Sequence, residues 1–156
     1  MAEKPVPGTF CWNELMTKDA AAAKTFYAAL FGWKMSDMDM GAGGTYTMLK
    51  RGDKDVGGLM QIRPDMGQLP SHWLAYVDVT NVDAATKKAG ELGARVQVPG
   101  MDIPGIGRFG VFEDPTGATL AVFQRAPAAA QPAKRAKSAK PAKRAKSKAA
   151  KKGKRK

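Results

Sequence analysis

Two side chains that can exchange protons occur in apolar segments of this chain. Glu14 lies within the segment 11–16, and His72 opens the segment 72–79. A carboxyl group and an imidazole can act as an acid–base couple on a bound molecule, or hold a weakly bound metal ion together with waters. Alternatively, the two groups form a polar pair that anchors a ligand or holds two parts of the chain together. Glu14 and His72 are therefore the catalytic candidates, with both interpretations open.

Side-chain alternation along a strand predicts which residues share a face with these two. It places Trp12 on the face of Glu14, and Leu74 on the face of His72. We expect this face to bind a small apolar or aromatic molecule, which the two polar groups would orient. The alternative is that its aromatic and methionine side chains only fill the core between two halves. The candidate ligand-binding residues are Trp12, Glu14, Tyr46, Met60, His72, Leu74, Tyr76, Phe109 and Ala121.

The elements that must position this face begin with a strand and a helix. The segment 9–16 is rich in apolar and aromatic residues and predicts a strand. Asp19 predicts the N-cap of a helix, because its carboxylate can accept from free backbone N–H groups, and Gly32 predicts the helix end. The predicted inner face of this helix consists of Ala23, Phe26, Tyr27 and Leu30, and short strands are expected at 33–36, 45–49 and 56–62.

The second half of the core repeats this order. Asn81, the predicted cap of a second helix, lies 62 residues after Asp19, and similar apolar segments precede both caps. An internal repeat of this kind predicts duplicated halves that pack together, with a site between them. The expected elements are a strand at 72–79, a helix with the inner face Val82, Ala85, Ala89 and Leu92, and strands at 95–98, 108–112 and 118–123.

These elements predict an α+β fold of two βαβββ modules and a separate basic tail. Two helices cannot cover both faces of a sheet of about eight strands, so the sheet is expected to curl into a concave cup. The domain is expected to span 1–125, with halves at about 7–62 and 70–125. The tail, 126–156, contains 13 of the 26 basic residues and no acidic residue, so the core is close to neutral.

Two other motifs have simpler interpretations. The segment 105–110 spells G-x-G-x-x-G, but a strand rather than a helix is expected after it, so it predicts a turn and not a dinucleotide site. Asp114 opens a tight turn at 114–117, where aspartate is favoured for local hydrogen bonding. Cys11, the single cysteine, excludes an internal disulfide, and alternation predicts that it points to the helix layer, away from His72.

The order of elements and its residues resemble the vicinal-oxygen-chelate superfamily of glyoxalase I, bleomycin-resistance proteins and extradiol dioxygenases. The matching segments are 11–15, 23–27, 30–33, 107–109 and 114–118, and they look most similar to the glyoxalase-like antigen branch. The resemblance implies the two-module cup, and it implies either ligand binding without chemistry or an enzyme of the lyase or dioxygenase type. Homodimers also occur among such folds, so pairing of two copies is an open expectation.

The resemblance also implies four metal-ligand positions, which are usually His, Gln or Glu. Transferred by their spacing from the helix caps and the last turn, these positions are Trp12, Met60, Leu74 and Ala121. None of the four side chains is a ligand for a hard or borderline divalent ion. We therefore expect neither a metal nor another cofactor at these positions.

The tail resembles the Lys/Ala/Pro tails of linker histones in composition. A segment with so few apolar residues is expected to be disordered, and its charge predicts salt-sensitive, sequence-independent binding of nucleic acid or another polyanion. A solubility or partner-docking tail is the alternative, and membrane insertion is not expected. Residues 1–7 do not resemble a signal peptide, so a cytoplasmic protein is expected. The basic tail favours association with the nucleoid. The nucleic-acid candidates are Lys134, Arg135, Lys137, Lys140, Lys143, Arg144, Lys146, Lys148, Lys151, Lys152, Lys154, Arg155 and Lys156.

Overall fold

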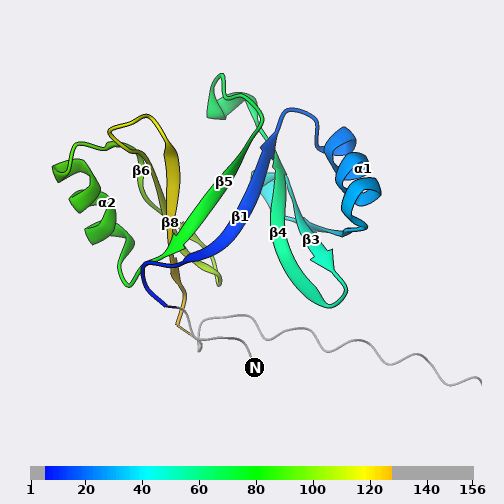
Figure 1. Cartoon of the computed structure of the whole chain (residues 1–156), viewed down its shortest axis with the longest axis horizontal. Coiled ribbons are helices and arrows are strands. Elements are labelled where there is room, and N and C mark those ends of the chain that lie inside the picture. The colour runs from blue at the N-terminus through cyan, green and yellow to red at the C-terminus, as the bar shows by residue number, and fades with distance from the viewer. Residues whose placement is uncertain (1–5, 128–156) are drawn as a thin grey trace, which may run out of the picture.

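A computed structural model describes residues 6–127 and shows two halves with the same order of elements (Figure 1). Short 3-10 turns at Gly41–Gly43 and Pro64–Met66 join some of these elements. The first half contains β1 (Phe10–Thr17), α1 (Ala20–Phe31), β2 (Lys34–Asp39), β3 (Thr45–Arg51) and β4 (Lys54–Gln61). The second contains β5 (His72–Asp78), α2 (Val82–Glu91), β6 (Arg95–Ile103), β7 (Gly107–Glu113) and β8 (Thr119–Arg125).

All eight strands form one curled, unclosed sheet in the order β2-β3-β4-β1-β5-β8-β7-β6. The order is symmetric about the antiparallel pair β1–β5, which joins the two halves. Within each half the first and last strands pair in parallel, β1 with β4 and β5 with β8. The α+β fold of two βαβββ modules is thus confirmed.

Both helices begin at the predicted caps. The Asp19 side chain accepts a hydrogen bond from Ala22 N at 2.9 Å, and the Asn81 side chain accepts one from Ala84 N at 2.8 Å. These bonds satisfy backbone donors that the first helical turn leaves free. Gly32 ends α1 in the left-handed conformation with φ 66°, which glycine adopts without steric cost.

The two helices cover the same, convex face of the sheet. Ala23 and Tyr27 of α1 pack on a cluster of Leu15, Leu49 and Leu59. Under α2, a Cβ added at Gly110 would lie 2.5 Å from Thr86 Cγ2 and 3.2 Å from Val82 Cγ1, so helix and strand are in close contact there. The opposite face carries no helix of the described residues, and it is the concave face.

The predicted inner faces of the helices are partly wrong. Phe26 and Leu30 are exposed by 58% and 56%, so only Ala23 and Tyr27 of the α1 set face the sheet. In α2, Leu92 is 70% exposed and caps the helix C-terminus, while Thr86 is buried. The Thr86 hydroxyl can be buried because it donates to backbone carbonyls, including Pro99 O at 2.6 Å.

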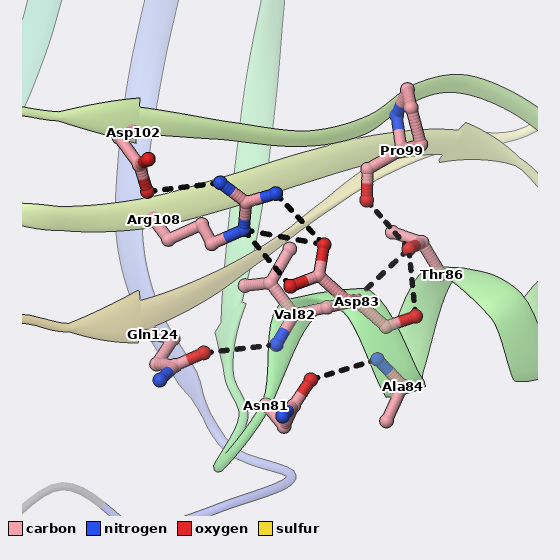
Figure 2. Close-up of polar contacts among 9 residues, drawn as sticks. All are labelled: Asn81, Val82, Asp83, Ala84, Thr86, Pro99, Asp102, Arg108 and Gln124. Atoms are coloured by element: carbon pink, nitrogen blue, oxygen red, sulfur yellow. Dashed lines mark hydrogen bonds and ion pairs between the residues drawn. The ribbon is translucent and has the colours of Figure 1, made fainter.

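A polar network fastens α2 to the edge of the sheet (Figure 2). The Arg108 guanidinium on β7 donates to Asp83 in the first turn of α2 at 2.8 Å and to Asp102 on β6 at 2.9 Å. Its pKa rises further above its usual value because these carboxylates hydrogen-bond to it. The Gln124 side chain accepts from Val82 N at 3.1 Å, which ties β8 to the start of α2. Arg108, part of the sequence resemblance, thus has a structural role.

The two turn predictions are confirmed. Gly105 lies in the turn between β6 and β7 with φ 73°, and β7 begins at Gly107 where a dinucleotide site would require a helix. The Asp114 carboxylate accepts from Thr116 N at 2.8 Å and from Ala118 N at 3.0 Å. These local hydrogen bonds lower the pKa of Asp114. Within residues 6–127, no helix is both long and apolar enough to cross a membrane.

Two glycine-to-alanine substitutions should have opposite effects on the stability of the second half. At Gly110 a Cβ would lie 2.5 Å from Thr86 Cγ2 and 3.0 Å from Val98 O, and we expect Gly110→Ala to cost about 1–3 kcal/mol through overpacking. Gly90 lies within α2 and a Cβ there would meet Val96 Cγ2 at 3.6 Å, an ordinary contact. Gly90→Ala should therefore gain up to about 1 kcal/mol. Urea unfolding of the two variants measures both, and a destabilised Gly90→Ala would contradict this packing.

Candidate functional site

Strand pairing brings the candidate residues of the two halves onto the concave face. Across β1–β5, Trp12 lies opposite Tyr76, Glu14 opposite Leu74, and Met16 opposite His72. Residues directly opposite each other in a sheet project from the same face. Because Glu14 and His72 belong to neighbouring pairs on this face, they are diagonal rather than direct neighbours.

The flanking strands extend this face in both directions. Met60 lies opposite Tyr46 in β3–β4, and Ala121 lies opposite Tyr76 in β5–β8. Phe109 lies opposite Phe123 in β7–β8. A continuous apolar cluster results, which contains Trp12, Met16, Met60, Leu74, Tyr76, Phe109, Val111, Ala121 and Phe123.

Glu14 lies at the centre of this face and is only 7% exposed. The Tyr76 hydroxyl donates to Glu14 Oε1 at 3.1 Å and links the second half to the first. The Tyr46 hydroxyl also hydrogen-bonds to the carboxyl group, and it accepts from Trp12 Nε1 at 3.0 Å. Gly58 makes room for the Tyr46 hydroxyl, since a Cβ at Gly58 would lie 1.8 Å from it.

Burial controls the protonation of this cluster. It raises the pKa of Glu14, because desolvation disfavours the carboxylate, while hydrogen bonds from Tyr46 and Tyr76 and the nearby His72 imidazole act in the opposite direction. The pKa values of both tyrosines rise through burial and through the negative charge of Glu14. The tyrosines therefore remain protonated and act as hydrogen-bond donors to the carboxyl group.

The His72 ring is hydrogen-bonded to the backbone close to it in the sequence. Its Nδ1 lies 2.7 Å from Pro70 O, and a carbonyl can only accept, so Nδ1 carries the proton and donates. In the neutral ring, Nε2 is then the acceptor. Glu14 and His72 are diagonal neighbours across β1–β5, and the side chain of the second half that donates to the Glu14 carboxyl is Tyr76.

The concave face has buried residues at its centre and partly buried residues around them. Leu74, Tyr76 and Ala121 are buried, which agrees with their interpretation as core residues. Trp12 and Phe109 are only partly buried and pack against the cluster from its margins, as do Met60 and Met66. Two surface hollows lie away from this face, one of about 420 Å³ beside α2 and one of about 280 Å³ near Asp78 and Arg125.

The orientation predicted for Cys11 is wrong. The β1–β5 register shifts between Phe10 and Trp12, and this irregularity interrupts the simple alternation of side chains. Cys11 packs against the concave-face cluster, and its Sγ lies 3.5 Å from Tyr76 O. Burial, followed by the charge of Asp78, raises the pKa of the thiol to about 11, so Cys11 stays protonated at neutral pH.

The four positions that the resemblance assigns to metal ligands do not fit a metal. Trp12, Met60, Leu74 and Ala121 all belong to the concave-face cluster, and their side chains are an indole, a thioether and two aliphatic groups. A divalent ion of the hard or borderline type is bound by carboxylate oxygen or imidazole nitrogen. Within residues 6–127, no three His, Cys, Asp or Glu side chains are grouped as metal ligands.

Sequence reasoning missed the polar role of the tyrosines and several apolar members of the cluster. Tyr46 and Tyr76 were expected as pocket walls, yet their hydroxyls are the partners of Glu14. Met66 and Phe123 were not predicted. Phe123 could have been found by alternation from Ala121, whereas Met66 lies in a 3-10 turn that has no strand periodicity.

Proteins with similar sequences are named as a glyoxylase or as a biosynthesis protein. "Putative glyoxylase CFP32" of Mycobacterium bovis is 43% identical over 120 residues, which are 77% of this chain and 45% of that protein. "Anthracycline biosynthesis protein DnrV" of Streptomyces peucetius is 37% identical over 132 residues, with 76% and 48% covered. The chain thus spans about half the length of the curated relatives it matches.

Solved structures show the same fold at low sequence identity. A methylmalonyl-CoA epimerase from Mycobacterium tuberculosis aligns with a TM-score of 0.56 and 14% identity, over 81% of this chain and 94% of the epimerase. Homoprotocatechuate 2,3-dioxygenase from Brevibacterium fuscum, with 3,4-dihydroxyphenylacetate bound, aligns with a TM-score of 0.54 and 22% identity, over 78% and 38%.

The model of one protein family matches most of the domain. It covers residues 10–122, from the first residue of β1 into β8. This range includes both modules and every candidate residue on the concave face. The chain belongs to the Glyoxalase/Bleomycin resistance protein/Dioxygenase superfamily.

Proposed function

We propose that the concave face binds a small aromatic or apolar molecule without the help of a metal ion. The observation that carries this proposal is the partly buried aromatic surface around a buried, hydrogen-bonded Glu14. Small-molecule sites combine mostly apolar walls with a few fixed polar groups. Trp12, Met60 and Phe109 would contact the apolar part of the ligand.

The polar cluster would fix the orientation of the ligand. Glu14 is held by Tyr46 and Tyr76, so the hydroxyl groups cannot rotate freely and their positions are set before binding. His72 would present Nε2, because Nδ1 is engaged with Pro70 O. A flat aromatic system that carries hydroxyl or carbonyl groups matches this arrangement, and a relative named for anthracycline biosynthesis is consistent with such a ligand.

An enzyme of the lyase or dioxygenase type is the alternative function. The name of the glyoxylase relative favours it, and Glu14 and His72 are the acid–base groups available for it. In that case His72 Nε2 would take or give a proton, and the raised pKa of Glu14 would suit a general acid. Turnover that disappears in both Glu14→Gln and His72→Ala, with ligand binding retained, would favour the enzyme over the binding protein.

The basic tail suggests a second interaction. Its thirteen basic residues lie outside the described residues, so the proposal rests on their charge alone. Such a segment would bind duplex nucleic acid through its phosphates, without sequence preference. A cytoplasmic, nucleoid-associated protein is the localisation that this interaction would favour.

The ligand proposal can be tested with daunorubicin, a fluorescent anthracycline, added to nuclease-treated protein. We expect saturable binding that Phe109→Ala weakens about tenfold, because the loss of an aromatic contact costs on the order of 1.4 kcal/mol. Leu92→Ala is the matched control, since it removes an apolar side chain that is 70% exposed at the end of α2. Equal weakening in both variants, or no saturable binding by the wild type, would count against the concave site.

The raised pKa of Glu14 predicts a pH-dependent stability difference between the wild type and Glu14→Gln. In the unfolded chain the carboxyl has its ordinary pKa, so at pH values between this pKa and the raised pKa of the folded state, the folded state binds more protons. The resulting contribution to wild-type stability is complete at pH values below the ordinary pKa. It is lost as the pH rises through the raised pKa of the folded state. Urea unfolding from acid to neutral pH should therefore show Glu14→Gln gaining relative to the wild type. A pH-independent difference would show that the carboxyl is not perturbed.

The tail proposal predicts a strong salt dependence of DNA binding. If about half of the tail charges contact phosphates, the logarithm of the binding constant should fall with the logarithm of salt at a slope of about −6. Removal of 128–156 should abolish binding, and it preserves the hydrogen bond from Ala126 N to Ile106 O. Fluorescence anisotropy with two unrelated duplexes measures this, and undiminished binding by the truncated chain would refute the proposal.

A further inference from the structure

Two thioethers and an imidazole lie next to one another on the concave face. Met60, Met16 and His72 belong to β4, β1 and β5, which are neighbouring strands at the centre of the sheet (Figure 1). Met16 lies opposite Met60 in the parallel pair and opposite His72 in the antiparallel pair. Neighbouring strands are about 4.8 Å apart, so the three residues form one row across the sheet. We name Met16, Met60 and His72 the thioether–imidazole row.

The thioether–imidazole row is largely shielded from water. Met16 is only 8% exposed, and Met60 is partly buried against the same cluster. Met66, in the 3-10 turn that follows β4, packs against this cluster as well and brings a further thioether close to the row. A small ion held by the row would therefore exchange most of its water for side-chain donor atoms.

The His72 ring is oriented as a metal-binding histidine usually is. Its Nδ1 donates to Pro70 O at 2.7 Å, and within residues 6–127 its Nε2 has no hydrogen-bond partner. A histidine that binds a metal through one ring nitrogen commonly donates the other N–H to a carbonyl or carboxylate, which fixes the tautomer and the ring orientation. His72 is the only histidine of the chain.

The donor atoms of the row determine which ion they suit. Thioether sulfur is a soft ligand that favours Cu(I), and imidazole also binds copper, whereas hard ions prefer carboxylate and water. Both kinds of donor are neutral, so a monovalent ion gains from a nearby negative charge. Glu14, two residues before Met16 on the same face, has a buried carboxyl group that can supply this charge.

We propose that Met16, Met60 and His72 bind one Cu(I) ion through two thioether sulfurs and the imidazole Nε2. Only Met60 also belongs to the four positions that the resemblance assigns to metal ligands, and those four do not fit a divalent ion. The alternative is that the methionines only fill an irregular apolar interior. Packing alone does not account for an imidazole whose Nδ1 is engaged and whose Nε2 lacks a partner beside two thioethers.

The copper site goes beyond the proposed binding of an aromatic molecule. The two share Met60 and His72 Nε2, so bound copper would compete with that molecule for these side chains. Copper binding is measured without any organic ligand of the concave face. A protein that binds daunorubicin but no copper would overturn only the copper site, and the reverse result would overturn only the aromatic ligand.

The experiment is a competition for Cu(I) between the nuclease-treated full chain and bicinchoninic acid, a coloured Cu(I) chelator, with ascorbate and without oxygen. We expect one Cu(I) per chain. Met16→Leu, Met60→Leu and His72→Gln should each raise the dissociation constant at least about a hundredfold, because even the loss of a residue that only supports a ligand costs about 10–100-fold. Exchange of methionine for leucine conserves volume, so the fold is retained.

Two control variants should bind Cu(I) as the wild type does. Met35→Leu makes the same exchange at a partly buried methionine that packs on Leu15, Leu49 and Leu59 under α1. Cys11→Ser removes the single thiol, which is the other soft ligand of the chain. Circular dichroism confirms that all variants remain folded.

A second measurement identifies the nitrogen that binds the ion. In the Cys11→Ser protein, the ¹⁵N resonance of His72 Nε2 should move when Cu(I) is added, while Nδ1 keeps its proton. The proposal is overturned if the wild type cannot compete with the chelator, if Cys11→Ser or Met35→Leu weakens binding as much as Met16→Leu, if Nε2 does not respond, or if Zn²⁺ binds the row as tightly as Cu(I).

Discussion

The antiparallel pairing of β1 with β5 is the constraint on which the rest of the structure depends. It joins two modules that are each a half-sheet with one helix, and it makes a single curved sheet from them. The same pairing places Glu14 of one module within reach of the Tyr76 hydroxyl of the other. Burial of a carboxyl group without hydrogen-bond partners would destabilise the folded state. The strand pairing supplies such a partner, and the hydrogen bond in turn helps to hold the two modules together.

The two modules have the same order of elements but attach their helices to the sheet in different ways. In the second module, charged and hydrogen-bonding residues such as Arg108 and Thr86 fasten the helix to the sheet edge. In the first module, aromatic rings around Tyr27 do this instead. The outer side of α2 therefore remains polar, whereas the aromatic residues that attach α1 extend to the surface of that helix.

Much of the fold could be predicted from the sequence, because local signals determine it. Asp19, Asn81 and Gly32 mark the helix ends through backbone hydrogen bonding, and every predicted strand is present with shifted ends. The inner helix faces were harder to predict, because Phe26 and Leu30 are apolar but exposed. Apolar character alone does not determine which helix residues face the sheet, because much of a folded protein's surface is apolar.

The candidate site was predictable to the level of a shared face but not of its contacts. Alternation placed Trp12 on the face of Glu14 and Leu74 on the face of His72, since strand periodicity is local. The Glu14–Tyr76 hydrogen bond depends on the register between distant strands, and the position of Cys11 depends on an irregularity of that register.

The strand pairing also has an evolutionary consequence. Because Trp12, Met60, Leu74 and Ala121 belong to one cluster on the four central strands, point substitutions there can exchange one chemistry for another while the backbone stays unchanged.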